Sequence, residues 1–260
     1  MRELEREITP PQAALPALAL LGRGRVGCSL QHAAKAAGIE VVLAGRKEIE
    51  RAASAEAVVL CVPDSAIADA AEAVARQAPN LRFIGHTSGA TTLDALAAAD
   101  AQAFSLHPLQ TVPAPDTDLT GAPCAIAGST AAALDLARSL ALKLGMRPFC
   151  VREEDRAAYH AAASIASNFL ITLEESASAL LADAGAGEEA RELLAPLVLR
   201  TAANWADHGA AALTGPIARG DEETVERHLA ALTESAPELI DLYRALAART
   251  RAIAATEAAA

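Results

Sequence analysis

Short apolar runs alternate with amphipathic stretches along the N-terminal part of the chain. From Ala17 onwards the runs are rich in Val, Ile, Leu and Ala, as the buried strands of parallel sheets are. Most of the intervening stretches have the length and composition of helices, and this alternation predicts parallel strands covered by helices. The runs predict strands at residues 17–21, 40–44, 57–62, 81–86, 101–106, 124–127 and 147–151.

The strand signals stop after about Glu153. The remaining sequence is helical in pattern almost to its end, with glycines and Pro237 as interruptions. We therefore expect an α/β fold with two domains: a doubly wound, mostly parallel sheet at residues 16–152, followed by an all-helical domain at residues 153–260. Residues 1–15 are expected to be a flexible leader.

One predicted helix, from Ala157 through Leu173, contains no Asp, Glu, Lys or Arg. At 1.5 Å per residue it would be about 25 Å long. A helix without a charged face is usually buried on all sides. One small domain can hardly enclose such a helix, so we expect a homodimer formed by the helical domain, with Trp205 as a large apolar anchor.

Charge and cysteine content exclude several classes of function. A formal net charge of −11 argues against nucleic-acid binding, which depends on clustered Lys and Arg. The four cysteines are widely spaced, so neither a metal site nor a redox dithiol is expected, and they are predicted to be small buried residues. The sequence shows no signal peptide and no apolar run of roughly 20 residues, so no membrane partner is expected and a cytoplasmic location is predicted.

The first predicted strand leads into GRGRVG, in which Gly22, Gly24 and Gly27 have GxGxxG spacing. In this motif the first glycine allows a tight turn, the second lets a pyrophosphate approach the backbone, and the third lets helix and strand pack closely. The following helix would offer free N–H groups to the phosphates. The position between a strand and a helix predicts a dinucleotide-binding Rossmann domain, with Arg25 and Val26 also at the cofactor. The alternative is a glycine-rich turn without a ligand.

The second strand ends in Gly45, Arg46 and Lys47, where an NAD site would place a carboxylate for the ribose 2′-hydroxyl. Cationic side chains there would pair with a 2′-phosphate, so NADP(H) is the expected cofactor. An ordinary solvated basic turn is the alternative. Val62 and Pro63, at the end of the third strand, are expected beside the nicotinamide half of the cofactor, or else belong to a core strand and a helix cap.

Polar residues follow two further strands, in HTSGA and in SLHPLQ. We predict that His107 is the general acid or base and that Ser88 contacts the substrate or cofactor, because both lie at strand ends where this fold binds ligands. His86 is a weaker candidate for the proton donor. A structural role in a constrained turn is the alternative for each.

On the charge-free helix His160, Ser164 and Asn168 lie at i, i+4 and i+8, on one stripe of its surface. They could hold the substrate, or they could bond to neighbouring helices. The only lysines are Lys35, Lys47 and Lys143. None lies in the helical domain, which excludes a lysine general acid from that domain.

Several motifs in order carry a family resemblance: GRGRVG, CVPDSAI, GHTSGATTLDAL, SLHPLQT, YHAAASIASNFL and LTGPIARGDEETVERHL. Together they resemble bacterial Rossmann-like proteins whose C-terminal half is a domain of unknown function. More distantly the chain resembles pyrroline-5-carboxylate reductase, ketopantoate reductase, prephenate dehydrogenase and the 6-phosphogluconate dehydrogenase group. The prephenate dehydrogenase resemblance maps a substrate-contacting serine and histidine onto Ser88 and His107. The hydroxyacid dehydrogenases have Lys and Asn where this chain has Ser164 and Asn168.

These resemblances imply an NADP-dependent oxidoreductase that transfers hydride to or from a carbonyl, imine or secondary alcohol of a small metabolite. In this hypothesis His107 transfers the proton, while Ser88, Ser164 and Asn168 orient the reacting oxygen between the domains. Arg219 is a candidate for an anionic substrate group or a capping residue. The competing hypothesis is a non-catalytic NADP(H)-binding sensor or assembly protein.

Overall fold

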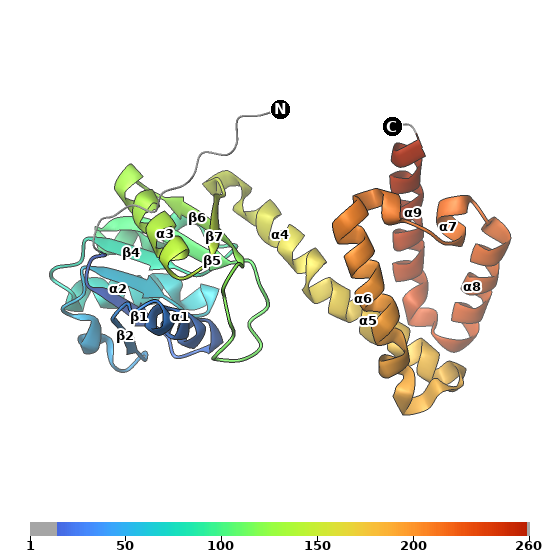
Figure 1. The fold of residues 1–260 in the computed structure, drawn as a ribbon, viewed down its shortest axis with the longest axis horizontal. Coiled ribbons are helices and arrows are strands. Elements are labelled where there is room, and N and C mark those ends of the chain that lie inside the picture. Colours follow the sequence, from blue (N-terminus) through green and yellow to red (C-terminus); the bar gives the residue numbers. More distant parts are fainter. Residues whose placement is uncertain (1–14, 259–260) are drawn as a thin grey trace. The chain divides into compact units, whose positions relative to one another are not determined.

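The structure is a computed structural model that describes residues 15–258 (Figure 1). The leader expected at residues 1–15 therefore lies outside the described residues, except for Leu15. The chain divides into two compact units, one ending at Ile165 and the other beginning at Ala166. In the part of the chain that is described, no helix is both long and apolar enough to cross a membrane.

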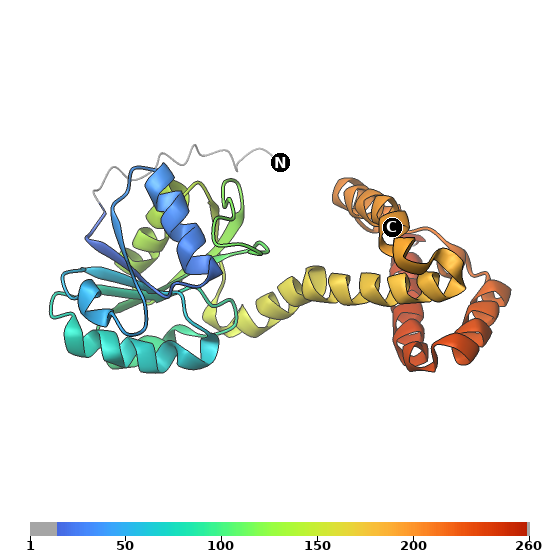
Figure 2. The same cartoon turned by 90° about the horizontal axis from the view of Figure 1, so that it is seen from below.

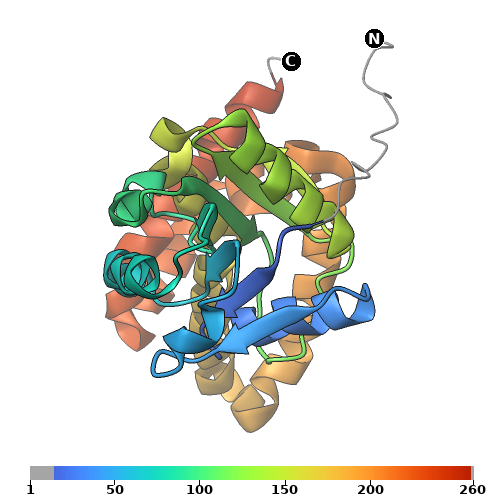
Figure 3. The same ribbon diagram turned by 90° about the vertical axis from the view of Figure 1, so that its left-hand side faces the viewer.

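A seven-stranded sheet forms the centre of the first unit (Figure 3). The strand order is β2-β1-β3-β4-β5-β6-β7, and every pair is parallel except β5 and β6. The predicted strands and the mostly parallel doubly wound sheet are thus confirmed. The strands are β1 (Leu18–Leu21), β2 (Val41–Ala44), β3 (Ala57–Leu60), β4 (Phe83–His86), β5 (Gln102–Pro108), β6 (Pro123–Gly128) and β7 (Arg147–Cys150).

Helices cover both faces of this sheet (Figure 2). On one face, α1 (Arg25–Ala36) and α3 (Ala131–Lys143) bury Leu30, Leu136 and Leu140 against the strands. On the other face, α2 (Ile67–Gln77) and the 3-10 segment η3 (Leu93–Ala99) bury Ile67, Val74 and Leu96. Because both faces are covered, β1 and β3 are apolar throughout rather than alternating. Shorter 3-10 segments are η1 (Ile49–Ala52), η2 (Asp64–Ala66) and η4 (Glu153–Asp155).

The order in which strands are added to the sheet reverses between β1 and β3, since β2 lies on one side of β1 and the later strands lie on the other. Ligands of open α/β sheets bind outside the carboxyl ends of the strands at such a switch point. Here that edge is formed by the residues after β1 and β3, followed by the ends of β4 and β5. The fold thus brings the GRGRVG loop (residues 22–27, the predicted phosphate loop), the residues that follow β3, His86 and His107 to one edge.

The charge-free segment is two helices, which corrects the prediction of one helix from Ala157 to Leu173. Helix α4 (Arg156–Ala166) ends before Ser167, whose φ of −123° and ψ of −73° are not helical, and α5 (Asn168–Leu181) follows. Serine readily adopts such a local break because its hydroxyl competes for backbone hydrogen bonds. His160, Ser164 and Asn168 therefore do not share one continuous helical stripe.

The second unit consists of helices, as expected (Figure 1). After α5 come a kinked segment (Ala182–Ala186), η6 (Gly187–Glu189), α6 (Ala190–His208), η7 (Gly209–Ala212), α7 (Pro216–Arg219), α8 (Glu222–Ser235), η8 (Pro237–Leu239) and α9 (Ile240–Ala258). Its core is thin. Among its described residues, the buried apolar ones are Ala190, Val225, Leu232, Ala236 and Ala247.

The cysteines are less uniformly buried than predicted. Cys61 and Cys124 are buried in the sheet, but Cys28 is half-buried and Cys150 is exposed. Cys150 ends β7, an edge strand with a partner on one side only, so its side chain is not covered as those of the central strands are. All four thiols are free.

Candidate functional site

Two of the three loop glycines are required by close backbone packing. A Cβ atom on Gly22, whose φ is +129°, would lie 2.1 Å from the Cys61 carbonyl oxygen. A Cβ on Gly27 would lie 2.0 Å from the carbonyl oxygen of Gly22. These glycines hold the end of β1, the end of β3 and the first turn of α1 together, which are the mechanical tasks expected of the first and third glycines.

Gly24 differs, because a Cβ atom there would meet nothing within 4 Å. It is the N-cap residue of α1, where no side chain caps the helix, and the first turn of α1 contains no acidic residue. The N–H groups at the start of the helix, including those of Arg25 and Val26, therefore face an open space with the positive end of the helix dipole. This is the arrangement that a pyrophosphate group requires.

A carboxylate does lie beside the tip of β2, although the sequence interpretation expected none there. The turn after Ala44 folds Glu48 back, so that its Oε2 accepts a hydrogen bond from the Gly45 N–H at 2.9 Å. The same oxygen pairs with Arg23 at 2.7 Å, and Oε1 lies 3.7 Å from Arg51. The Gly45 hydrogen bond and the two arginines lower the pKa of Glu48, which is therefore ionised at neutral pH.

Arg46 and Lys47 are exposed at the same turn. Within residues 15–258, neither side chain forms an ion pair. At the neighbouring strand end, Val62 is half-buried and Pro63 is exposed just after β3. The predicted cofactor residues thus surround one sheet edge, with cationic side chains at the end nearest β2.

The two candidate histidines at strand ends differ in accessibility. His86 is completely buried, and neither ring nitrogen has a hydrogen-bond partner. Burial, with a smaller contribution from Arg156, lowers its pKa to about 4. His107 is only partly buried, so of the two it is the one that a substrate could reach.

His107 is held by Tyr159, a residue that the sequence interpretation missed. The Tyr159 hydroxyl lies 2.6 Å from Nδ1 of His107, and the two rings meet edge to face. Burial is the largest cause of the lowered pKa of His107, about 4, followed by His160 and Arg156. His107 is therefore neutral at pH 7. No spacing signal links residues so far apart in the chain, because only the packing of α4 on the sheet brings them together.

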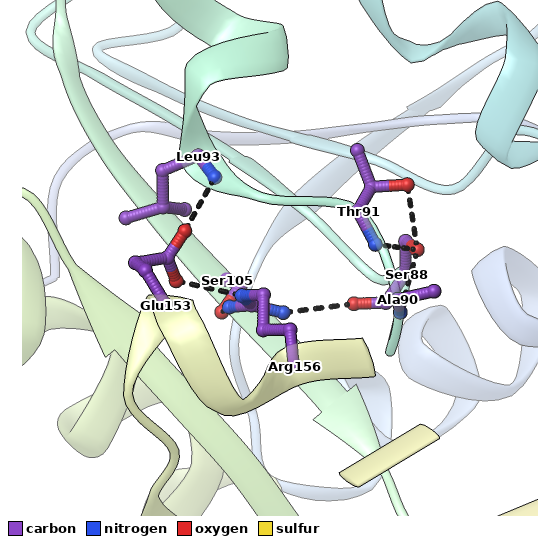
Figure 4. Close-up of polar contacts among 7 residues, drawn as sticks. All are labelled: Ser88, Ala90, Thr91, Leu93, Ser105, Glu153 and Arg156. Carbon is purple, nitrogen blue, oxygen red and sulfur yellow. Dashed lines mark hydrogen bonds and ion pairs between the residues drawn. The ribbon is translucent and has the colours of Figure 1, made fainter. Parts of the chain in front are cut away.

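The Ser88 hydroxyl is already engaged in a turn. It accepts hydrogen bonds from the N–H groups of Ala90 and Thr91 and donates one to Thr91 Oγ1 (Figure 4). Its side chain is almost completely buried. Ser88 therefore shapes the loop after β4, and its backbone carbonyl accepts a hydrogen bond from Arg156.

A buried arginine joins this loop to α4 (Figure 4). Arg156 bonds to the Ser105 hydroxyl on β5 and pairs with Glu153 at 2.6 Å. The other Glu153 oxygen accepts the Leu93 N–H at 2.6 Å, at the start of η3. A buried charge needs such a partner. This network could not be predicted from the sequence, since Glu153 and Arg156 resemble the polar residues at any helix start.

Of the remaining predicted residues on the charge-free segment, His160 lies near His107, whereas Ser164 and Asn168 make no hydrogen bond with it within residues 15–258. Ser164 is half-buried on α4, and its side chain makes no hydrogen bond within the described chain. Asn168 is exposed at the start of α5 and belongs to the second unit. His160, one residue after Tyr159, does lie near His107, with ring centroids 6.3 Å apart.

Comparison with known proteins agrees with this architecture. Residues 122–250 match the family model described as a domain of unknown function, DUF2520, so that domain is present in the chain. No curated protein matches the sequence. The presence of this domain and the similar folds described below confirm the resemblance to Rossmann-like proteins with a C-terminal domain of unknown function.

Three solved structures are similar along almost their entire length. A Bacteroides fragilis protein, to which an NADP oxidoreductase activity is ascribed, has a TM-score of 0.76 at 20% identity, covering 91% of this chain and 98% of its own. Protein TM1727 from Thermotoga maritima has a TM-score of 0.75 at 22% identity, covering 93% and 99%. A pyrroline carboxylate reductase from Plasmodium falciparum with NADP bound has a TM-score of 0.60 at 11% identity, covering 93% and 100%. At these identities the similarity establishes the fold.

Proposed function

We propose that this chain, a Rossmann-fold protein with a DUF2520 domain, is an NADP(H)-dependent oxidoreductase acting on a small metabolite. The observation that carries the proposal is the open approach at Gly24, at the start of α1 and beside the switch point of the sheet. Backbone atoms occupy the space that a side chain on Gly22 or Gly27 would need, whereas the space beside Gly24 is open to a ligand. The NADP oxidoreductase and the NADP-bound reductase of similar fold support the same cofactor.

The chain offers residues for each part of the cofactor, with the Glu48 carboxylate as an opposing charge at the tip of β2. Backbone N–H groups of Arg25 and Val26 would bind the pyrophosphate at the start of α1. Arg46 and Lys47, exposed at the tip of β2, would pair with the 2′-phosphate. Val62 and Pro63 would contact the nicotinamide half.

The bound cofactor would supply the hydride, and the protein would supply orientation and a proton. His107 is partly accessible and neutral, so it can act as a base or as a hydrogen-bond donor to a substrate oxygen. Ser88 would support this site through the shape of its loop. In this proposal Ser164, on α4, remains a candidate for substrate contact.

We further propose a homodimer formed through the second unit. Large apolar side chains on α5 and α6 are exposed in the single chain, among them Phe169, Ile171, Leu199 and Trp205. A patch of this kind, beside a thin core, is typical of a subunit interface. The charge-free composition of the segment around Ser167 is consistent with that role.

An activity screen tests the proposed reaction class. We expect the protein to oxidise NADPH in the presence of some small carbonyl or imine compounds, or to reduce NADP⁺ with a secondary alcohol. The expected His107→Gln result is loss of turnover with NADPH affinity unchanged. NADPH binding without turnover across a broad panel would instead favour a sensor or assembly protein.

A further inference from the structure

The imidazole rings of His107 and His160 both lie close to Gly89, in the loop after β4, and meet edge to face with their centroids 6.3 Å apart. A Cβ atom on Gly89 would lie 3.0 Å from Nε2 of His107 and 2.9 Å from Nδ1 of His160. The two nitrogens are therefore at most about 6 Å apart, a separation that one hydrogen-bonded oxygen atom can bridge. Only a glycine at this position lets both rings approach so closely.

The hydrogen bond from Tyr159 determines which nitrogen of His107 carries its hydrogen. A phenol, with a pKa near 10 in water, is a much stronger acid than the N–H of a neutral imidazole. Burial raises the pKa of Tyr159 further, to about 12, so the hydroxyl keeps its hydrogen at neutral pH. We therefore assign the hydroxyl, 2.6 Å from Nδ1, as the donor of this hydrogen bond, and this assignment puts the single hydrogen of the neutral ring on Nε2.

His160 provides the complementary group. Its Nδ1 is covered by the protein yet has no hydrogen-bond partner among residues 15–258. Two N–H groups directed into the same small space would repel each other, so Nδ1 of His160 is the acceptor where Nε2 of His107 is the donor. The pair offers one donor and one acceptor, which is the complement of a hydroxyl group.

We propose that His107 and His160 bind the reacting oxygen of an alcohol–carbonyl substrate pair, and that Tyr159 is the positioning residue that fixes the His107 tautomer. This inference rests on the proposed oxidoreductase function and narrows its substrate class. The alcohol oxygen accepts from Nε2–H of His107 and donates to Nδ1 of His160. Bound NADP⁺ would accept the hydride of the alcohol carbon, Nδ1 of His160 would take the proton of the oxygen, and the resulting carbonyl would keep its hydrogen bond from His107.

The protonated imine, which is the form that accepts a hydride readily, does not fit this pair. A protonated imine nitrogen carries a hydrogen and has no free lone pair, so it could bond to Nδ1 of His160 but would confront the N–H of His107. Such a contact would place two donors together and leave both without an acceptor. The site therefore favours ketones or aldehydes and the corresponding alcohols.

The tautomer is tested by nuclear magnetic resonance of the ring nitrogens in ¹⁵N-histidine-labelled full-length protein, without cofactor, at neutral pH. We expect His107 to be neutral with its hydrogen on Nε2, and Tyr159→Phe to give a mixture of tautomers. Tyr243→Phe is the matched control, because the Tyr243 hydroxyl lies 2.8 Å from Nδ1 of His228 in the second unit. That control should alter His228 and leave His107 unchanged.

A hydrogen on Nδ1 of His107, or no response to Tyr159→Phe, would overturn the inference. If Tyr159→Phe does not fold, His160→Gln serves in its place, because the proximity of His160 lowers the pKa of His107. The pKa of His107 should then rise, and an unchanged value would contradict the pairing.

The substrate class is tested separately with NADPH and a matched panel of small ketones and cyclic imines. Turnover of ketones with loss in His160→Gln supports the inference. Turnover of imines alone would overturn it and leave the proposed oxidoreductase function intact. Failure to bind NADPH would contradict the proposed function and hence this inference, even if the tautomer of His107 were as expected.

Discussion

The glycines of the phosphate loop differ in what a side chain would meet, and this difference can be measured. Gly22→Ala or Gly27→Ala should lower the free energy of unfolding by more than about 2 kcal/mol, because each Cβ would collide with backbone. Gly24→Ala should change it by less than about 1 kcal/mol, since the space there is open. Urea unfolding of the three variants checks this. A similar loss in all three would show that Gly24 is also held by packing.

We predict that Glu48 affects the balance between NADPH and NADH binding at the tip of β2. Its ionised carboxylate pairs with Arg23 and would repel a 2′-phosphate, but it could accept a hydrogen bond from a ribose 2′-hydroxyl. Glu48→Gln should therefore strengthen NADPH binding a few-fold and weaken NADH binding. Glu50→Gln, at an exposed position in the same region, is the control. Equal changes for both cofactors would mean that Glu48 only shapes the turn.

Two residues of the candidate site, Glu48 and Tyr159, were not predicted from the sequence. Residues 45–47 contain no carboxylate, but the tight turn that follows brings the Glu48 carboxylate back to the Gly45 N–H. Tyr159 immediately precedes His160 in YHAAAS, yet its partner His107 is on a strand of the sheet. Local patterns give no information on such distant contacts.

At the scale of elements, the strands were predictable because buried parallel strands are short apolar runs between polar turns. The break at Ser167 was not, since the segment contains neither Gly nor Pro. The sequence also placed the change of architecture at Glu153. The first compact unit runs on to Ile165, because Arg156 and Tyr159 tie α4 to the sheet.

The Glu153–Arg156 pair should contribute measurably to the stability of the first unit. Glu153→Gln leaves the buried guanidinium of Arg156 without its countercharge, and removing one partner of such a pair is costly. Because Glu153 is partly exposed, we expect a loss of roughly 2 kcal/mol in the free energy of unfolding. Glu154→Gln, whose ion pair with Arg152 is exposed, should have almost no effect. If Glu153→Gln and Glu154→Gln had equal effects in denaturant unfolding, the buried pair would contribute nothing to the free energy of unfolding.

At the scale of the whole molecule, the exposed apolar side chains of the second unit predict self-association. Leu199→Glu should convert a dimer into a monomer at micromolar concentration, because the leucine is 72% exposed in the single chain and a charge would be buried on pairing. Light scattering measures the mass directly. Ala230→Glu, at an exposed position on α8, is the control and should remain dimeric. A wild-type monomer would contradict the proposal.

The two-part organisation followed from the sequence, because the strand pattern stops and a helical pattern continues. The dimer prediction began from the lack of charge between Ala157 and Leu173 and gains support from the exposed Phe169 and Ile171. The sequence does not identify the substrate, since that depends on side chains that only the tertiary fold brings together.

The most direct test of the central claim is a calorimetric titration of the full-length protein with NADPH and with NADH. The account predicts that NADPH binds, more tightly than NADH, and that Gly24→Asp abolishes binding while the protein remains folded. The aspartate would place a side chain and a negative charge in the approach to the pyrophosphate. Undiminished NADPH affinity in Gly24→Asp, or no binding of either cofactor to the wild type, would contradict it.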